Sequence, residues 1–267
     1  MTKTNPVELV QRYRLIYAYK FASRFAYRKV VLDVGCGAGY GVYELSKVAQ
    51  LAVGIDISRE KIIFSHLKYG DNASFIVASA LNLPFRKCSF YIVTSFQVIE
   101  HINPKMVNTY LNEIKYVLKD DGMFILSTPN KRLRLLPLQK PWNPEHWKEY
   151  DEKELRRILK PVFPNIKIYG LSATKTIYMT EYNRVKQNPF KIYIIQPLAN
   201  IISKLHLPII IVSLLKASYL RITRAYLSKL KSKEVSNLNF RDIVLENFYF
   251  TRENLKSCLD FYAVCKK

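Results

Sequence analysis

The sequence predicts an α/β fold in which parallel strands alternate with helices. The first observation is the stretch 30–41, where an apolar run ends at Asp33 and three glycines follow at alternate positions. The second is a segment of helical character, 40–49, followed by another apolar run, 51–55, which ends at Asp56. A strand, a glycine turn and a helix together bring bare backbone and a helix N-terminus against a ligand.

The glycine spacing narrows the class of ligand. Glycines suit such a turn because it needs unusual dihedral angles and leaves no room for a Cβ beside the ligand. Asp56, at the end of the second strand, is placed to accept hydrogen bonds from both hydroxyls of a ribose. Dinucleotide enzymes carry G-x-G-x-x-G, but here Tyr40 stands three residues after Gly37. The dinucleotide pattern therefore fails.

The remaining elements follow from apolar runs and cap residues. Further strands are expected at 75–78, 90–96, 123–127, 165–172 and 259–265, which brings the sheet to seven. Helices are expected from Ser58, a good N-cap residue, and over 104–118 and 151–160, with a turn at 120–122.

The glycine loop resembles motif I of the class I S-adenosylmethionine-dependent methyltransferases, hydrophobic-hydrophobic-D-x-G-x-G-x-G. The likeness covers about residues 29–170 and continues in order through Asp56, 81–85, 95–102 and 118–130. The nearest branch is the small-molecule group often labelled type 11. The resemblance implies a doubly wound, seven-stranded Rossmann-like sheet with an antiparallel last strand, and S-adenosyl-L-methionine as cofactor.

Within that fold, four parts of the chain are expected. They are an N-terminal helical cap at 1–28, a cofactor-binding core at 29–172, a helical insertion at 173–250 and a final strand at 251–267 that completes the core. The cap is expected either to cross the cofactor mouth or merely to cover a sheet edge.

The resemblance also implies a set of cofactor-binding residues. Asp33 orders the glycine loop and Asp56 holds the ribose. Ser79 stands where the family commonly has an Asp that contacts the adenine amino group, and Phe96 and Gln97 lie along the methionine part. The expected set is Asp33, Gly35, Gly37, Gly39, Asp56, Ile57, Ser79, Ala80, Leu81, Phe96 and Gln97.

Two histidines are the candidate catalytic residues, together with Glu100. The Glu100-His101 dipeptide resembles the family's E-H pair, which faces the acceptor, so His101 acts either as a general base or only as a packing residue at the start of a helix. His146 and Glu149 lie in a segment that resembles one in methyltransferases of glycans and quinones. They form a substrate clamp or, alternatively, cap helix 151–160.

No metal site is predicted from the sequence. In ubiquinone-type O-methyltransferases a similar E-x-x-E-H cluster holds a divalent metal. This chain has Gln97 at the place of the first glutamate.

The net charge of +21 is unevenly distributed. Residues 30–130 hold nine basic and nine acidic side chains, whereas 131–190 hold thirteen against six and 191–239 hold eight against one. The excess lies where a methyltransferase of this class binds its acceptor, which favours an anionic partner. A small-molecule, lipid-linked or glycan acceptor, an anionic membrane surface and RNA are all consistent with it, as is an ordinary solvated basic surface.

The insertion indicates a peripheral membrane contact or an internal lid. Residues 192–215 are mostly apolar but contain two prolines and a central Lys-x-His, which argue against a spanning helix. Residues 216–233 are basic with one apolar stripe, as in monotopic helices. The first residues lack the apolar segment of a secretory signal. A cytoplasmic enzyme, peripheral on the membrane in one of the two interpretations, is expected.

These features predict a methyltransferase that acts on an oxygen atom. The sequence lacks the N-P-P-[YF] tetrapeptide of many amino-nitrogen methyltransferases; Thr128-Pro129-Asn130 stands instead of it. An RNA methyltransferase and an inactive protein that keeps the cofactor fold are the alternatives.

Overall fold

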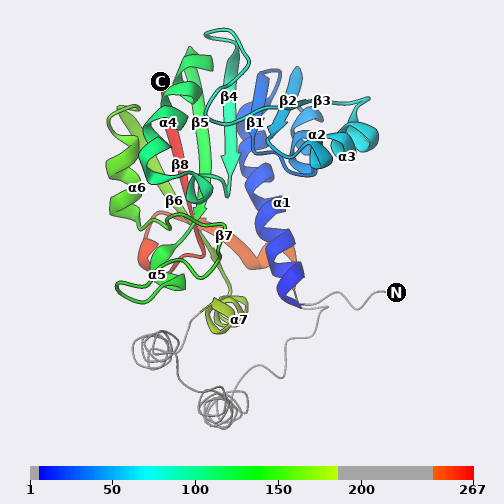
Figure 1. Cartoon of the computed structure of the whole chain (residues 1–267). Coiled ribbons are helices and arrows are strands. Elements are labelled where there is room, and N and C mark those ends of the chain that lie inside the picture. Colours follow the sequence, from blue (N-terminus) through cyan, green and yellow to red (C-terminus); the bar gives the residue numbers. More distant parts are fainter. Residues whose placement is uncertain (1–5, 186–242) are drawn as a thin grey trace, which may run out of the picture.

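A computed structural model describes residues 6–185 and 243–267. Their strands form one sheet in the order β3-β2-β1-β4-β5-β8-β6-β7 (Figure 1). The strands are β1 Val30–Val34, β2 Leu51–Asp56, β3 Ser74–Val77, β4 Phe90–Phe96, β5 Leu118–Pro129, β6 Asn165–Ala173, β7 Phe248–Thr251 and β8 Asp260–Lys266. The α/β class and the doubly wound sheet predicted from the sequence are confirmed.

The sheet is parallel from β3 to β5 and antiparallel beyond. The last strand, β8, inserts antiparallel between β5 and β6, as the resemblance implied. The count of seven is one short, because β7 adds an antiparallel edge strand beside β6. The sequence pattern placed β7 in a helical insertion, although Phe248 and Phe250 occupy alternate positions and pack on aromatic rings of the first helix.

Helices cover both faces of the sheet. The helices of four residues or more are α1 Pro6–Ala26, α2 Tyr40–Ser46, α3 Arg59–Tyr69, α4 Val107–Val117, α5 Lys131–Arg134, α6 Glu152–Leu159 and α7 Lys175–Val185. One hydrophobic cluster joins the sheet to α1, α2, α3 and α7, and a second joins it to α4 and α6. The expected N-terminal helix is one continuous element, which packs against α2, β4 and α7.

Strand periodicity explains the two clusters. Alternate residues of a strand point to opposite faces, so Val31 belongs to the first cluster and Leu32 to the second. The same alternation separates Ile92 from Val93 on β4. All four side chains are nearly inaccessible to solvent, as expected for central parallel strands covered on both faces.

Local signals define most element boundaries. The Ser58 hydroxyl accepts a hydrogen bond from the Lys61 backbone N–H and caps α3, as predicted. Asp151 and Glu154 form a capping box at the start of α6. The turn predicted at 120–122 falls within the bounds of β5, at an irregularity where the pairing with β4 passes from Leu118 directly to Met123.

The predictions on 192–215 and 216–233 lie outside the described residues. Across 6–185 and 243–267, no helix combines the length and the apolar character that crossing a membrane requires.

Candidate cofactor and acceptor site

The common direction of the parallel strands gathers the predicted site at one edge of the sheet. β1 ends in the glycine loop, β2 ends at Asp56, and β4 ends at Phe96, with β5 beside it. Ligands bind at such carboxyl edges of open α/β sheets, where the strand order reverses. Here the order reverses between β1 and β4.

The three glycines of the loop serve different purposes. All three have positive φ angles, +79° at Gly35, +54° at Gly37 and +78° at Gly39. A Cβ on Gly35 would lie 2.5 Å from a Val98 methyl carbon, and one on Gly39 would lie 2.7 Å from Ser65. A Cβ on Gly37 meets no described atom within 4 Å. Only Gly37 therefore borders open space, and it is the glycine that leaves room for a ligand.

Asp56 is held in place by the loop it faces. Its Oδ2 accepts a hydrogen bond from the Gly37 N–H at 2.9 Å, and its Oδ1 accepts one from the Ser58 N–H at 2.9 Å. Each carboxylate oxygen keeps a further lone pair. Asp56 can therefore still accept hydrogen bonds from two ligand hydroxyls, and its contact with a ribose stays a prediction.

Asp33 lies behind the loop and not in the open space. Its side chain is 1% exposed and accepts hydrogen bonds from the Tyr19 hydroxyl at 2.8 Å and from Thr94 Oγ1 at 2.6 Å. Burial raises the pKa of the Asp33 carboxyl to about 6, although both hydrogen bonds favour its ionised form. This placement fits the predicted ordering role and excludes direct solvent contact.

Tyr19 on α1 packs over the loop, a contact that the sequence motifs did not predict. Its ring meets Phe96 edge-on at a centroid distance of 5.0 Å. A Cβ on Gly41 would overlap the same Tyr19 ring, so only glycine permits this approach of α1 and α2. The signal was Gly41 itself, a poor helix former at the second position of α2.

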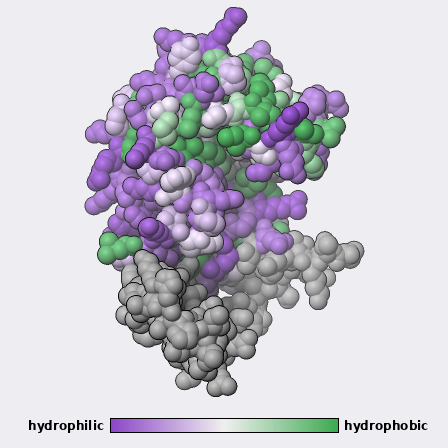
Figure 2. Space-filling view, viewed as in Figure 1, coloured by the Kyte–Doolittle hydropathy of each residue, from purple (hydrophilic) through white to green (hydrophobic). Residues whose placement is uncertain are grey.

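The predicted adenine side lies at the ends of β2 and β3. Ile57 is 78% exposed and Val77 is 48% exposed, so both offer apolar surface to a planar ring. Figure 2 shows hydrophobic side chains gathered on the side where Figure 1 places α2 and α3. The Ser79 oxygen accepts the Leu81 N–H at 3.2 Å, which keeps the Ser79 hydroxyl in a tight turn. Ala80 and Leu81 pack partly against the core there.

Gln97 directly follows β4 and lies in the chain between Phe96 of the predicted cofactor site and Glu100 of the predicted acceptor site. It has a φ of +58°, unusual for a residue other than glycine, and its amide donates to Ser127 Oγ at 3.2 Å and to Asp260 Oδ1 at 3.4 Å. A cavity of about 50 Å³ lies beside it and includes Phe96 and Arg14 in its lining. Strain of this kind clusters at functional sites.

A buried ion cluster borders the same cavity and was also missed. Arg14 on α1 pairs with Asp260 at the start of β8 and with Glu181 on α7, the latter at 2.9 Å. All three side chains are at most 7% exposed. Arg14 lies more than 160 positions from each of its two partners in sequence, so no local pattern could connect it to them.

Glu100 and His101 lie in a single 3₁₀ turn, Ile99–His101, that follows β4. Glu100 is fully buried, and its Oε2 accepts a hydrogen bond from the Thr128 hydroxyl at 3.0 Å. Burial raises the pKa of Glu100 to about 8 and outweighs that hydrogen bond. Burial, followed by the neighbouring His146, lowers the pKa of His101, so its imidazole is neutral near pH 7.

The loop before α6 returns His146 to this turn. The Trp147 N–H donates to the Glu100 carbonyl at 2.8 Å, and the His101 and His146 rings lie 4.7 Å apart in an edge-on arrangement. Glu149 is buried between His146 Nδ1 and Arg134 Nε, each 2.9 Å from its Oε1. His146 and Glu149 therefore do not cap α6, because Asp151 does.

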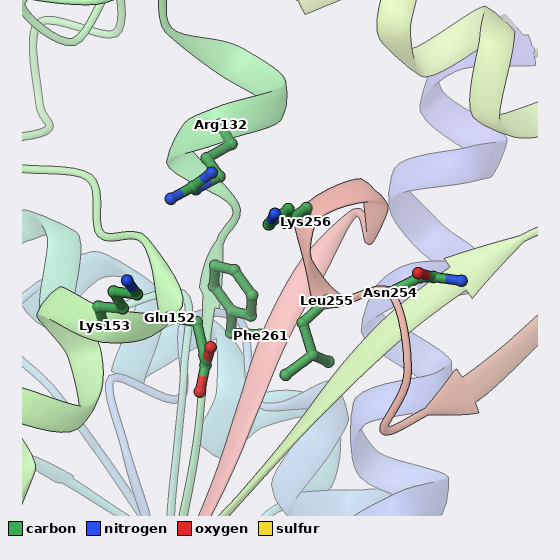
Figure 3. Close-up of a pocket in the computed structure, with 7 residues that line it drawn as sticks. All are labelled: Arg132, Glu152, Lys153, Asn254, Leu255, Lys256 and Phe261. Carbon is green, nitrogen blue, oxygen red and sulfur yellow. The ribbon is translucent and has the colours of Figure 1, made fainter.

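A larger, basic cavity of about 340 Å³ lies near the same end of β5 and β8. Figure 3 shows the charged ends of Arg132, Lys153 and Lys256 around the ring of Phe261. One acid, Glu152, lines the cavity, and it is paired with Arg156 at 3.0 Å. The cavity therefore presents net positive charge over an apolar floor.

Comparison with known proteins identifies the domain. Residues 32–126, from β1 into β5, match a family described as a methyltransferase domain. The resemblance to the type 11 S-adenosylmethionine-dependent methyltransferases that the sequence motifs predicted is confirmed over this range. The matched range holds the glycine loop, Asp56 and the Glu100-His101 turn, and it stops before the His146 loop.

The curated relatives that this chain resembles include proteins named as methyltransferases. The chain is 31% identical over 150 residues to a probable S-adenosylmethionine-dependent methyltransferase of Mycolicibacterium smegmatis, covering 56% of each protein. It is 28% identical over 137 residues to a ubiquinone biosynthesis O-methyltransferase of Haemophilus ducreyi, covering 48% of this chain and 57% of the relative. The chain thus spans about half the length of the curated relatives it matches.

Solved structures share the fold at low identity. The YcgJ protein of Bacillus subtilis aligns with a TM-score of 0.53 and 17% identity over 94% of this chain and 99% of its own. The [4+2]-cyclase SpnF aligns with a TM-score of 0.55 and 14% identity over 95% of this chain and 81% of its own. Because one of these is a cyclase, the methyltransferase fold alone does not establish the reaction.

The site fits S-adenosyl-L-methionine, the cofactor of this family. Gly37 borders open space, and Asp56 keeps free acceptor capacity on both carboxylate oxygens. The methyltransferase domain thus has free space beside Gly37 and, at Asp56, a carboxylate that can accept hydrogen bonds from ligand hydroxyls.

Proposed function

We propose that this chain transfers a methyl group from S-adenosylmethionine to a hydroxyl oxygen of a small, lipid-linked or glycan acceptor that carries an anionic group. The observation that carries the proposal is the position of Glu100, His101 and His146 at the same sheet edge as the glycine loop and Asp56. A bound cofactor supplies an electrophilic sulfonium methyl group. The chain's own residues then have to align the acceptor, exclude water and remove a proton.

His101 is suited to remove the hydroxyl proton. Its Nδ1 lies 3.0 Å from the Glu145 carbonyl oxygen, and because a carbonyl can only accept, Nδ1 carries the hydrogen. The lone pair is then on Nε2. The acceptor oxygen bonds to the methyl carbon while the sulfur–methyl bond breaks with its electron pair left on sulfur, and the hydroxyl proton passes to the imidazole.

The basic cavity supports an anionic acceptor. Arg132 follows Asn130 at the end of β5, and Lys256 belongs to the turn that the Asn130 amide holds through the Lys256 carbonyl at 3.2 Å. A phosphate or carboxylate group beside Arg132 and Lys256 would keep the acceptor near the carboxyl edge of the sheet. Phe261 offers an apolar contact at the cavity floor.

Incubation with isotopically labelled methyl donor tests this function. The protein would be mixed with lipid, glycan and RNA fractions, and products would be resolved by mass spectrometry. Label on a hydroxyl of an anionic lipid-linked or glycan molecule is the expected result. Label on RNA would show that the acceptor is RNA and would contradict the lipid-linked or glycan acceptor. Absence of label from all fractions despite cofactor binding would favour the non-catalytic alternative.

The sequence of the insertion supports a peripheral membrane contact for the same enzyme. Residues 192–215 are mostly apolar and 216–233 are basic, and each basic residue near anionic headgroups contributes about 1 kcal/mol. The protein is expected to co-sediment with anionic liposomes more strongly than with neutral ones. Charge reversal at Arg221 and Arg224 should weaken this binding. Retention of RNA without liposome binding would contradict the membrane proposal.

A further inference from the structure

Three metal-ligating side chains converge at the acceptor edge of the sheet. One ligand atom each of Glu100, His101 and His146 lies within 4.8 Å of the other two. They come from two separate segments, the turn after β4 and the loop before α6, which the Trp147 N–H to Glu100 carbonyl bond joins. Gln97 is not part of the group, because its side chain turns to Ser127 and Asp260.

The hydrogen bonds around both imidazoles leave the same nitrogen free. His101 Nδ1 donates to the Glu145 carbonyl at 3.0 Å, and His146 Nδ1 donates to Glu149 Oε1 at 2.9 Å. Both acceptors place a hydrogen on Nδ1, so Nε2 is the nitrogen of each ring that can offer a lone pair to a metal. A histidine that donates one ring N–H to a carboxylate or carbonyl while its other nitrogen stays free is the usual arrangement of a metal ligand.

The carboxylate atoms of the group are incompletely satisfied. Glu100 Oε1 and Glu149 Oε2 are buried and have no hydrogen-bond partner among the described residues. Two buried acids lie here, Glu100 and Glu149, and the buried cation Arg134 pairs with Glu149 alone of the two. Buried oxygen atoms without partners are rare in native proteins, and a missing ion is one of the regular explanations.

We propose that Glu100, His101 and His146 bind a divalent transition-metal cation, with Glu149 and Arg134 orienting His146. Two imidazole nitrogens and one carboxylate oxygen suit Zn²⁺, Mn²⁺ or Fe²⁺ better than Mg²⁺ or Ca²⁺, which prefer oxygen ligands. Ligands at about 2.0–2.1 Å around a tetrahedral ion lie about 3.4 Å apart. Small side-chain rotations therefore suffice to close the set.

Three protein ligands leave a coordination position for another molecule. This part of the inference rests on the proposed function: an acceptor hydroxyl bound there would lose its proton more readily, because a divalent cation stabilises the alkoxide. The cation would then take over the task assigned above to the His101 imidazole. A hydroxyl flanked by a second oxygen donor, such as a diol or a hydroxy acid, would fit an open site of this kind best.

Metal binding can be measured without any acceptor. The full chain would be stripped with chelator and titrated with Zn²⁺, Mn²⁺ and Mg²⁺ by calorimetry, and metal content would be measured by plasma mass spectrometry. One equivalent of Zn²⁺ or Mn²⁺ is expected. His146→Gln and Glu100→Gln should weaken binding more than about 100-fold, and Glu149→Gln about 10–100-fold, as for other outer-shell partners. His66→Gln, an exposed histidine on α3, is the matched control and should bind like the native chain.

The outcomes separate this inference from the proposed function. Binding of neither Zn²⁺ nor Mn²⁺, binding of Mg²⁺ alone, or equal loss in the His66 variant would overturn the metal site. The same calorimeter measures S-adenosylmethionine binding, which should be unchanged in all four variants. Methyl transfer that persists in chelator would also overturn the metal's role, and loss of transfer in a chain that still binds Zn²⁺ would count only against the proposed acceptor chemistry.

Discussion

The cofactor side and the acceptor side of this sheet edge are built in opposite ways. The cofactor side is made from one short stretch, 30–41, and Asp56, and its contacts use mainly backbone N–H groups. The acceptor side joins Arg14, Glu100, His146 and Asp260, which come from distant parts of the chain, and of these Arg14, Glu100 and Asp260 are buried. Changes on the first side should therefore alter ligand binding, whereas changes on the second should alter turnover or stability.

The largest effect is expected from the acceptor-side histidines. His101→Ala or His146→Ala should lower turnover about 10²–10⁴-fold, because proton removal loses its base or the cluster that positions it. Cofactor affinity should change little, since the two side chains contact each other, the Glu145 carbonyl and Glu149. Steady-state kinetics and calorimetry on the same samples check this, with His66→Ala as the control. Normal turnover in both variants would contradict the expectation that changes on the acceptor side alter turnover.

Arg14→Met should destabilise the fold by about 3–5 kcal/mol, because it leaves Asp260 buried without its cation, whereas Glu181 keeps its ion pair with Arg184. Chemical denaturation measures the loss. Arg12→Met, at an exposed position two residues earlier on α1, should cost far less. Equal stability of the two variants would mean that the buried cluster contributes nothing specific.

The buried Asp33 carboxyl behind the cofactor loop should make the stability of the fold depend on pH. Its folded-state pKa of about 6 lies above the ordinary value of 3.8, so its stabilising contribution is complete below about pH 3.8 and is lost as the pH rises through 6. The difference between the ordinary pKa of 3.8 and the folded-state pKa of about 6 corresponds to about 3 kcal/mol. The free energy of unfolding of the native chain should fall by this amount relative to Asp33→Asn between these pH values. A difference that stays constant with pH would contradict the assignment.

The smallest effect is expected at the ribose position. Asp56→Ala should weaken S-adenosylmethionine binding by about 1.5–3 kcal/mol, through loss of hydrogen bonds to a charged acceptor. Turnover at saturating cofactor should stay near normal. Asp71→Ala, an exposed acid after α3, is the control for calorimetry. Unchanged affinity would remove Asp56 from the cofactor site.

The same contrast explains how much the sequence could predict. The parallel strands, the Ser58 cap and the placement of Asp56 followed from local patterns, because a glycine loop and its flanking strands specify one another over a few residues. The sequence did not predict β7, because four residues at the end of the predicted insertion are too few to show a clear strand periodicity. Its pairing with β6 and its packing on α1 decide its structure.

The acceptor side could be predicted only in part. Glu100, His101 and His146 were each identified as candidates, but nothing in the sequence brings residues 45 positions apart to within 4.8 Å. That approach depends on the Trp147–Glu100 backbone bond and on Glu149 between His146 and Arg134. The absence of a predicted metal rested on Gln97 alone. The partnership of Arg14 with Asp260 depends on a helix meeting the last strand, which only the tertiary fold defines.

Calorimetric titration of S-adenosylmethionine into the native chain and into Gly37→Asn tests the central claim most directly. Gly37 has a φ of +54°, and no described atom lies within 4 Å of the position that a Cβ would take there. Asparagine tolerates this backbone conformation better than most other side chains. The account predicts one bound equivalent for the native chain and no measurable binding for a variant that unfolds at nearly the native temperature. Native affinity in the folded variant would show that the space beside Gly37 is not where the cofactor binds.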